Sequence, residues 1–457
     1  MRVEMKKRFG SSLSTTQKIM LSFFLSILAG SVLLALPISS ATGEAVPYLD
    51  ALFTATTSIC VTGLVTLPTV STWSFFGQLV ILLLIQTGGL GVITIMSGLM
   101  ISLHRKIGIG ERILIQDAFN LNTLSGLVKF IKKVIAGTLV VEGIGAMLYM
   151  LVFVPQYGLR GVWISVFNSV SAFCNAGIDI LSENSLCEYS SNPVINLVTG
   201  ALIILGGIGY IVWWDVLRVL KNVRSYRYKC FRYLSLHSKI AIWSTLILIG
   251  AGAIAVFIFE YHNPLTLGDY SLWEKMEASL FQSVTTRTAG FATIPQQNLT
   301  NATAIVSMML MFIGGSPVGT AGGVKTVTIA VLLASAFATI KNKDSVVLFD
   351  RTISKGAISK AVAVVSMSFI ILFASTVLLS AVTEASALDI AYETVSATAT
   401  VGLTRNLTPL LNVWGKLIII VTMYLGRIGP ISLAIAFSTR KESENNIKSP
   451  AEKISVG

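Results

Sequence analysis

The chain has 457 residues, of which 53% are hydrophobic and only 12% are charged, and its mean hydropathy is +0.76. Few soluble proteins combine these values, so the composition indicates a membrane protein. The formal net charge of +12 would suit a nucleic-acid partner, but the placement of the basic residues, described below, argues against one.

Apolar stretches long enough to cross a bilayer recur along the chain. Seven of them are Ile19–Leu36, Phe75–Leu103, Pro193–Trp214, Ile240–Phe259, Ala302–Val324, Ala361–Thr383 and Leu417–Phe437. An eighth, Val134–Val154, carries one acid, Glu142. No convincing signal-peptidase site follows the first stretch, so we interpret it as a span and not as a removed signal.

Lys and Arg are concentrated in alternate connections between these spans. Five bands hold 27 basic residues against 8 acids: 1–18, 104–133, 217–239, 341–360 and 440–457. The other four connections hold 4 against 12: 37–74, 155–192, 260–301 and 384–412. By the positive-inside rule, the basic bands and both termini are predicted to be cytoplasmic. The charge therefore belongs to a multi-pass protein of the cell membrane, and no nucleic-acid partner is expected.

Four similar blocks lie in the outer connections, and they align without gaps. The blocks are Asp50–Leu64, Ile164–Ile178, Glu277–Phe291 and Asp389–Leu403. Glycine is the fourteenth residue of each, and these glycines are spaced 114, 113 and 112 residues apart: Gly63, Gly177, Gly290 and Gly402. Each block contains a stretch too short to cross, which predicts a re-entrant half-helix. The acids Asp50, Glu277 and Asp389 are expected at half-helix N-termini, where a carboxylate complements the helix dipole.

The predicted fold is an all-α polytopic membrane protein with four tandem repeats of span, re-entrant pore loop and span around one central pore. The repeats are expected over 19–103, 134–216, 240–340 and 361–439. The cytoplasmic segments are then 1–18, 104–133, 217–239, 341–360 and 440–457. In the third repeat, the second span is predicted to be broken by an intramembrane loop, GGSPVGTAGGVK, which begins at Gly314.

Non-helical backbone inside a membrane leaves carbonyl groups unpaired, and this is tolerated where they line a wet cavity or bind an ion. Four such loops around one axis would form a ring of carbonyl oxygens that can replace the hydration shell of a monovalent cation. Glycine permits the backbone angles that turn those oxygens inward. Each half-helix would also point its negative C-terminal end at the ion.

With these features the chain resembles the Trk/Ktr/HKT superfamily of potassium transporters, most closely the membrane subunit of the bacterial Ktr type. The resemblance covers roughly residues 13–440 through the four blocks, the GGSPVGTAGGVKT run and the GRIGP run that begins at Gly426. In that superfamily, glycine at all four filter positions accompanies potassium selectivity, whereas serine at the first favours sodium. The resemblance assigns ion binding to Val61, Thr62, Gly63, Asn175, Ala176, Gly177, Thr288, Ala289, Gly290, Thr400, Val401 and Gly402.

The resemblance also makes the broken third-repeat span a gate that obstructs the pore below the filter. The gate residues it implies are Gly314, Gly315, Ser316, Pro317, Val318, Gly319, Thr320, Ala321, Gly322, Gly323, Lys325 and Arg427. Arg427 would face the pore, contact the loop and act as an electrostatic barrier. A phosphate-binding loop is the weaker interpretation of the same run, because Val324 stands where such a loop needs glycine before Lys325.

Several other polar or glycine positions have a simpler structural interpretation. Glu142 is expected to make a structural polar contact, although an intramembrane acid is a functional candidate by default. The runs from Gly88 and Gly206 are interpreted as close helix packing. Arg287 is expected to pair with an acid such as Glu274 or Glu277. At Asn175 the backbone carbonyl is the expected ligand, with a side-chain contribution left open.

The favoured function is potassium uptake through a channel-like selective pore, with sodium dependence left open. Sodium or non-selective cation transport is an alternative. Secondary transport of a small solute predicts inverted repeats, and a mere membrane anchor leaves the glycine blocks unexplained. No HExxH motif or membrane Ser–His pair is present, so the chain is not expected to be an enzyme.

Partners follow from charge and from the resemblance. The basic band from Arg218 to Lys239 could contact anionic lipid or an acidic protein surface. Members of the Ktr type form homodimers on a ring of cytoplasmic nucleotide-binding regulatory subunits, so a homodimer and such a ring are expected. This chain is expected to bind no cofactor, and no metal apart from potassium at the filter, with sodium as an activator left open.

Overall fold

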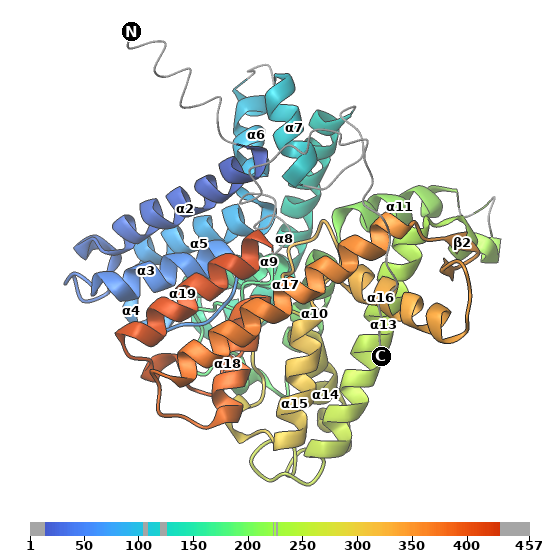
Figure 1. The fold of residues 1–457 in the computed structure, drawn as a ribbon. Helices are drawn as coiled ribbons and strands as arrows, with labels where there is room; N and C mark the ends of the chain where they lie inside the picture. The colour runs from blue at the N-terminus through green and yellow to red at the C-terminus, as the bar shows by residue number, and fades with distance from the viewer. Residues whose placement is uncertain (1–13, 104–107, 119–125, 223, 225–226, 430–457) are drawn as a thin grey trace.

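The computed structural model describes residues 14–103, 108–118, 126–222, 224 and 227–429. The cytoplasmic C-terminus predicted over 440–457 and the end of the last predicted span lie outside the described residues. Within them the chain is almost entirely helical (Figure 1), which confirms the all-α prediction. The only strands in the described part are β1 (Val347–Leu348) and β2 (Arg351–Thr352), which pair as a short antiparallel hairpin.

In each of the ranges predicted for the first two repeats, a long helix is followed by a shorter helix and then by a bent pair of helices. Repeat 1 contains α2 (Thr15–Leu34), η1 (Pro37–Ser39), α3 (Tyr48–Cys60), α4 (Thr69–Thr72), α5 (Phe75–Leu90) and α6 (Val92–Ser102), and α7 (Ile109–Ala118) follows. Repeat 2 contains α8 (Leu127–Tyr157), α9 (Leu159–Cys174), η2 (Cys187–Tyr189), α10 (Pro193–Gly207) and α11 (Tyr210–Lys221), and η3 (Arg227–Tyr233) follows.

In the ranges predicted for the last two repeats, a long helix is likewise followed by a shorter helix. Repeat 3 contains α13 (Leu236–Glu260), α14 (Leu272–Thr285), η4 (Gln296–Asn298), α15 (Asn301–Phe312) and α16 (Thr326–Ile340). Repeat 4 contains α17 (Lys355–Ser380), α18 (Ala387–Ala399), η5 (Thr408–Leu410) and α19 (Val413–Ile428). Side-chain caps define several starts; for example, Ser271 accepts a hydrogen bond from the backbone of Glu274, whose carboxylate accepts one from the backbone of Ser271.

Four helices in the described residues are long and apolar enough to cross a membrane, and the number rises to six if each of two bent pairs is one span. The bent pairs are α5 with α6, at 99°, and α10 with α11, at 100°. The apolar stretches Phe75–Leu103 and Pro193–Trp214 are therefore each bent and do not form one straight helix. The third-repeat break is present as predicted, between α15 and α16.

A glycine with positive φ stands at each bend. Gly91 has φ of 86°, Gly209 of 93°, and Gly429, which follows the end of α19, of 88°. Only glycine adopts such a conformation without strain, so the helix direction can change there. In the sequence, each of these glycines is the fourth residue of a four-residue glycine motif. The motifs follow the first, second and fourth blocks.

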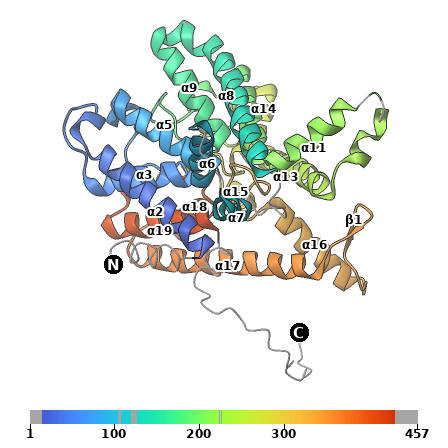
Figure 2. The ribbon, with the colours of Figure 1, turned by 90° about the horizontal axis from the view of Figure 1, so that it is seen from above.

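The repeats pack in cyclic order. The second helix of each repeat contacts the half-helix of the next: α5 contacts α9, α10 contacts α14, α15 contacts α18, and α19 returns to α3. Figure 2 shows the blue α2, α3 and α5 on one side, the teal α8 and α9 beside them, and the orange α17 along another edge.

The half-helices form the buried centre, and the long helices cover it. Every residue of α3 from Phe53 to Cys60 is buried. The long helices instead expose large apolar side chains, such as Ile254 of α13 at 62% and Phe373 of α17 at 66%. An exposed apolar exterior is what contact with lipid requires, and this chain is a multi-pass membrane protein.

Candidate functional site

Three of the four half-helices, α3, α9 and α18, end directly before the predicted filter segments, and α14 ends at Thr285, before Thr286 and Arg287. The residue that opens each filter segment (61–63, 175–177, 288–290 and 400–402) adopts the left-handed conformation. These residues are Val61, Asn175, Thr288 and Thr400, with φ of 53°, 60°, 66° and 52°. Four non-glycine residues in this sparsely populated region, one per repeat, indicate a backbone shape imposed by the surrounding structure.

The glycines of the filter segments close a ring. A β-carbon placed on Gly63 would lie 2.5 Å from the carbonyl oxygen of Ala176, in the next repeat. The same holds around the ring: Gly177 faces the oxygen of Ala289 at 2.5 Å, Gly290 that of Val401 at 2.5 Å, and Gly402 that of Thr62 at 2.2 Å. The structure therefore brings the four predicted segments together, with each glycine against a carbonyl of its neighbour.

Hydroxyl groups near the ends of the half-helices brace these segments. Thr57 Oγ1 accepts from the backbone N–H of Gly63 at 2.9 Å, and Ser396 Oγ accepts from that of Gly402 at 3.0 Å. Ser171 Oγ donates to the carbonyl of Ile178 at 2.5 Å, and Thr285 Oγ1 to that of Phe291 at 2.6 Å. These four residues were not among the predicted site residues, although the hydroxyl residues that recur in the middle of every block are a signal that could have identified them.

The gate loop, Gly314–Gly323, is closed at its neck by backbone pairing. The N–H of Gly314 donates to Val324 O at 2.9 Å, and that of Val324 donates to Phe312 O at 3.1 Å. The loop is thus a defined structure held between the end of α15 and the start of α16.

The gate loop is bound to the bend in repeat 2. Ser316 and Thr320 donate their N–H groups to the carbonyls of Gly207 and Gly206, at 2.8 and 3.1 Å. In return, the N–H of Tyr210 donates to Val318 O at 3.0 Å. The glycine bend between α10 and α11 exposes the backbone groups that these contacts use.

The gate loop also lies against the filter segments. The N–H of Gly322 donates to Thr288 Oγ1 at 3.1 Å, and Thr320 Oγ1 donates to Asn175 Oδ1 at 3.0 Å. A β-carbon on Gly322 would lie only 1.9 Å from Thr400 Oγ1. Three of the four filter segments are therefore in contact with the loop.

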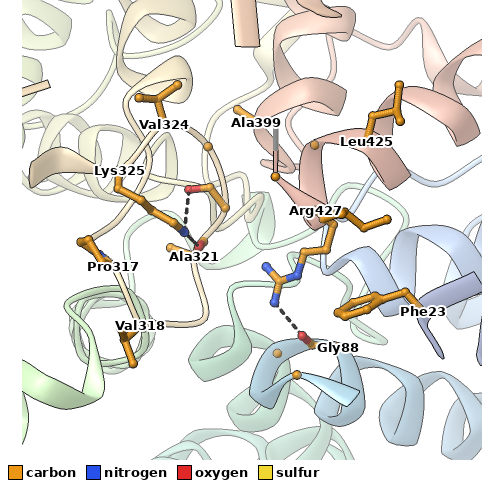
Figure 3. A pocket seen from close by; sticks show the side chains of 18 of the residues that line it. Phe23, Gly88, Pro317, Val318, Ala321, Val324, Lys325, Ala399, Leu425 and Arg427 are labelled. Atoms are coloured by element: carbon orange, nitrogen blue, oxygen red, sulfur yellow. Dashed lines mark hydrogen bonds between the residues drawn. The ribbon is translucent and has the colours of Figure 1, made fainter. Parts of the chain in front are cut away.

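Two basic side chains hold the gate loop through its carbonyl oxygens. Arg427 Nη1 donates to Thr320 O at 2.7 Å, and its Nη2 donates to Gly88 O at 2.6 Å. Lys325 Nζ donates to Ala321 O at 2.5 Å. Both side chains line a cavity of about 430 Å³, which they approach from the end of α19 and the start of α16 (Figure 3).

The expectation that Arg287 pairs with an acid is wrong. Its Nη2 donates instead to Gly314 O at 3.1 Å, at the start of the gate loop. Glu277 accepts from Asn196, and Glu274 caps its own helix. Glu277 also lies beyond the first turn of α14, where Glu274 occupies the predicted acidic position.

The other two predicted half-helix acids do lie in first turns, and each has a basic partner. Asp50 pairs with Lys416 at 2.5 Å, and Asp389 pairs with Arg405 at 2.7 Å. The first pair joins repeat 1 to repeat 4. Their predicted place at half-helix N-termini is confirmed, but their basic partners were not predicted.

The structure gives Glu142 its contacts. Gln86 Nε2 donates to Glu142 Oε2 at 3.2 Å, and Cys174 Sγ lies 3.8 Å from Oε1, behind the second filter segment. The structural interpretation of Glu142 agrees with these contacts.

Gly88 and Gly206, the first glycines of their runs, pack closely against half-helices. A β-carbon on Gly88 would lie 2.0 Å from the carbonyl oxygen of Ile59, and one on Gly206 would lie 1.9 Å from that of Phe173.

Comparison with known proteins supplies the family. The profile of the TrkH family, described as "Cation transport protein", matches residues 12–449. The chain is 41% identical to Ktr system potassium uptake protein B of Bacillus subtilis over 96% of each protein. It is 39% identical to the potassium/sodium uptake protein NtpJ of Enterococcus hirae over 99% of each.

A solved structure shares the fold. The crystal structure of the potassium transporter TrkH from Vibrio parahaemolyticus superimposes with a TM-score of 0.74 at 16% identity, covering 94% of this chain and 86% of that one. Because the family profile covers nearly the whole sequence and both of these relatives exceed 30% identity, the chain belongs to the TrkH family of cation transport proteins.

Proposed function

We propose that this chain takes up potassium through a selective pore formed by the four filter segments. The observation that carries the proposal is the closed ring in which each glycine lies against a carbonyl of the next repeat. Such a ring places backbone oxygens around one axis, where they can replace the hydration shell of a monovalent cation. The family is one of ion transporters and not of enzymes.

Two further features support a cation at this place. Three half-helices end directly at their filter segments and the fourth, α14, ends two residues before its own, so the negative ends of their dipoles point to the ring. Within the described residues, the buried hydroxyls of Thr62 and Thr400 have no hydrogen-bond partner. Buried hydroxyls without a partner in the protein are free to bind water or an ion.

The gate loop is proposed to close the path in this conformation. Its contacts with the filter segments leave no room for a side chain at Gly322, and Arg427 places a positive charge beside it. A fixed positive charge at a narrow passage is an electrostatic barrier to cations. Uptake then requires the loop and Arg427 to separate.

The direct test is ion flux into proteoliposomes containing this chain alone, with potassium and sodium gradients compared at a fixed voltage. Potassium-selective flux is expected. A preference for sodium would contradict the proposal, because all four ring positions are glycine. Repeating the potassium measurement with and without sodium tests whether sodium acts as an activator.

Sodium transport is the second candidate, favoured by the name of the Enterococcus relative, a potassium/sodium uptake protein. A substitution in the filter distinguishes potassium-selective uptake from sodium transport. If the ring selects potassium, Gly63→Ser should raise sodium flux relative to potassium flux, and an unchanged ratio would favour the non-selective alternative.

We further propose that the chain is a homodimer bound to a ring of cytoplasmic nucleotide-binding subunits, as its resemblance to the Ktr type suggests. Support comes from α11, whose basic Arg218 and Lys221 are exposed. The first residue of the same helix, Tyr210, hydrogen-bonds the gate loop. Cross-linking in native membranes tests the dimer, and nucleotide-dependent flux with co-expressed partner subunits tests the ring.

The proposed orientation places both termini in the cytoplasm. Leu410 and Lys343 are exposed and lie on predicted opposite sides. In a background with Cys187 and Cys230 replaced by serine, an impermeant thiol reagent added to intact cells should label Leu410→Cys and spare Lys343→Cys. The reverse labelling would invert the topology.

A further inference from the structure

We infer that Thr320 of the gate loop is a positioning residue for the second filter segment, so that the position of the gate affects ion selectivity through Asn175. The inference rests on the proposed function, because it takes the ring of filter segments to be the selective element. It adds a specificity-determining contact that lies outside that ring.

The contact is direct and buried. Thr320 Oγ1 lies 3.0 Å from Asn175 Oδ1 and 3.0 Å from the carbonyl oxygen of Phe173. Asn175 is 1% exposed and Thr320 is fully buried. A hydroxyl has a single hydrogen to donate, so the two acceptors of the second repeat share it.

Among the four residues that open the filter segments, Asn175 is the one whose side chain can transmit such a contact. The corresponding residues of the other repeats are Val61, Thr288 and Thr400, none of which carries an amide. Asn175 Nδ2 lies 3.5 Å from the carbonyl oxygen of Arg287, next to the third filter segment. The amide therefore bridges the gate loop and two neighbouring filter segments.

Arg287 also contacts the gate loop directly, through its side chain. Arg287 Nη2 donates to Gly314 O, at the other end of the gate loop. The gate loop thus touches this bridge at Thr320 and again at Gly314. Displacement of the loop breaks both contacts together.

Loss of the Thr320 hydrogen bond leaves the amide oxygen of Asn175 buried without a donor, which is unfavourable. The amide must then rotate toward another donor, or the segment must shift. Asn175 itself has φ of 60°, a conformation that depends on its surroundings. The second filter segment is consequently held in its present shape only while Thr320 stays in place.

The hydroxyl can be removed without releasing the loop. The backbone of Thr320 has its own anchors: its N–H donates to Gly206 O at 3.1 Å, and its carbonyl accepts from Arg427 at 2.7 Å. Thr320→Val deletes the shared hydrogen bond and keeps the branched shape. Thr326→Val is the matched control, because its buried hydroxyl lies 3.0 Å from Ser316 Oγ and makes no hydrogen bond to the filter.

The experiment measures the potassium-to-sodium flux ratio in proteoliposomes for the full-length chain, Thr320→Val, Thr320→Ser and Thr326→Val. We expect Thr320→Val to lower the ratio by about threefold to tenfold, the range that one hydrogen bond corresponds to. Thr320→Ser should retain the wild-type ratio because it keeps the hydroxyl, and Thr326→Val should retain it whatever happens to the rate. In an Asn175→Ala background, adding Thr320→Val should cause no further change.

Three results would overturn the inference. The first is a Thr320→Val ratio equal to the wild-type ratio, and the second is an equal fall in Thr326→Val, which would point to the loop in general. The third is an undiminished effect of Thr320→Val in the Asn175→Ala background. A wild-type chain that does not discriminate the two ions would instead refute the proposed function, and the two failures are thereby distinguished. Size-exclusion profiles and the Ser variant show that each protein is folded.

Discussion

Each ring glycine is confined by an atom of another repeat. At Gly290 a β-carbon would lie 2.5 Å from Val401 O, and φ is 85°. A side chain there must displace a carbonyl that we propose as an ion ligand, and it also carries a backbone strain of about 1–2 kcal/mol.

Gly290→Ser should therefore lower the potassium-to-sodium flux ratio while the protein is still expressed. The flux ratio in proteoliposomes is the measurement. Gly250→Ser is the control, because no atom lies within 4 Å of the β-carbon position at Gly250. An unchanged ratio in Gly290→Ser would remove Gly290 from the filter.

Arg427 should hold the gate closed, because its guanidinium joins Thr320 O to Gly88 O. Hydrogen bonds from a charged donor contribute roughly 1.5–3 kcal/mol each. Arg427→Ala should thus raise the rate of potassium uptake by about tenfold or more. Arg427→Lys keeps the charge but not the two-pronged geometry, and should lie between Ala and wild type. Uptake slower than wild type in Arg427→Ala would mean that the residue supports conduction.

The sequence revealed the residues of the site more readily than their contacts. The regular spacing of Gly63, Gly177, Gly290 and Gly402 predicted the four segments that the structure brings together, because an internal repeat preserves positions that only glycine can occupy. The partner of Arg287 could not be predicted in the same way. It is the backbone carbonyl of Gly314, and no residue type marks a free carbonyl in a sequence.

At the scale of elements, the bends of the second spans connect the gate to the rest of the protein. Hydropathy marks Phe75–Leu103 and Pro193–Trp214 as apolar stretches and says nothing of a bend in them, because one glycine barely changes the average over a span. The direction of the helix depends on φ at Gly91 and Gly209, and hydropathy carries no information about that angle. The glycine motifs can be seen in the sequence. Apart from the recurrence of glycine as their fourth residue, nothing in them indicates that the helix bends there.

Gly209→Ala should disturb the gate loop and the stability of the protein together. Its φ is 93°, and a β-carbon would lie 2.4 Å from Pro317 O, a backbone atom that cannot move alone. We expect a loss of roughly 1–3 kcal/mol, seen as a lower melting temperature in detergent, with an altered uptake rate. Gly200→Ala, in α10, meets only Val284 at 4.0 Å and should not lower the melting temperature. Equal stability of the two variants would show that the bend does not depend on glycine.

At the scale of the whole molecule, the cyclic packing joins the last repeat to the first. The contact of α19 with α3 closes the order. It includes the ion pair of Lys416 with Asp50, two residues 366 positions apart in the chain. The sequence indicated four repeats around an axis, but it could not identify this pair, because nothing in either residue's neighbourhood marks a partner so distant.

Breaking that pair should loosen the ring where it closes. The side chains of Lys416 and Asp50 are only 17% and 11% exposed, so removing one leaves the other charge poorly solvated. Lys416→Met should cost about 1–3 kcal/mol of stability, read as a lower melting temperature. Adding Asp50→Asn should recover part of the loss, because the unpaired carboxylate is then gone. Arg218→Met is the control: the Arg218 side chain is 64% exposed, and its partner Asp215 keeps a hydrogen bond from the backbone N–H of Ser235 at 2.8 Å, so the variant should cost under about 1 kcal/mol. If Lys416→Met were no worse than this surface variant, side-chain packing between α19 and α3, and not the ion pair, would account for closure of the ring.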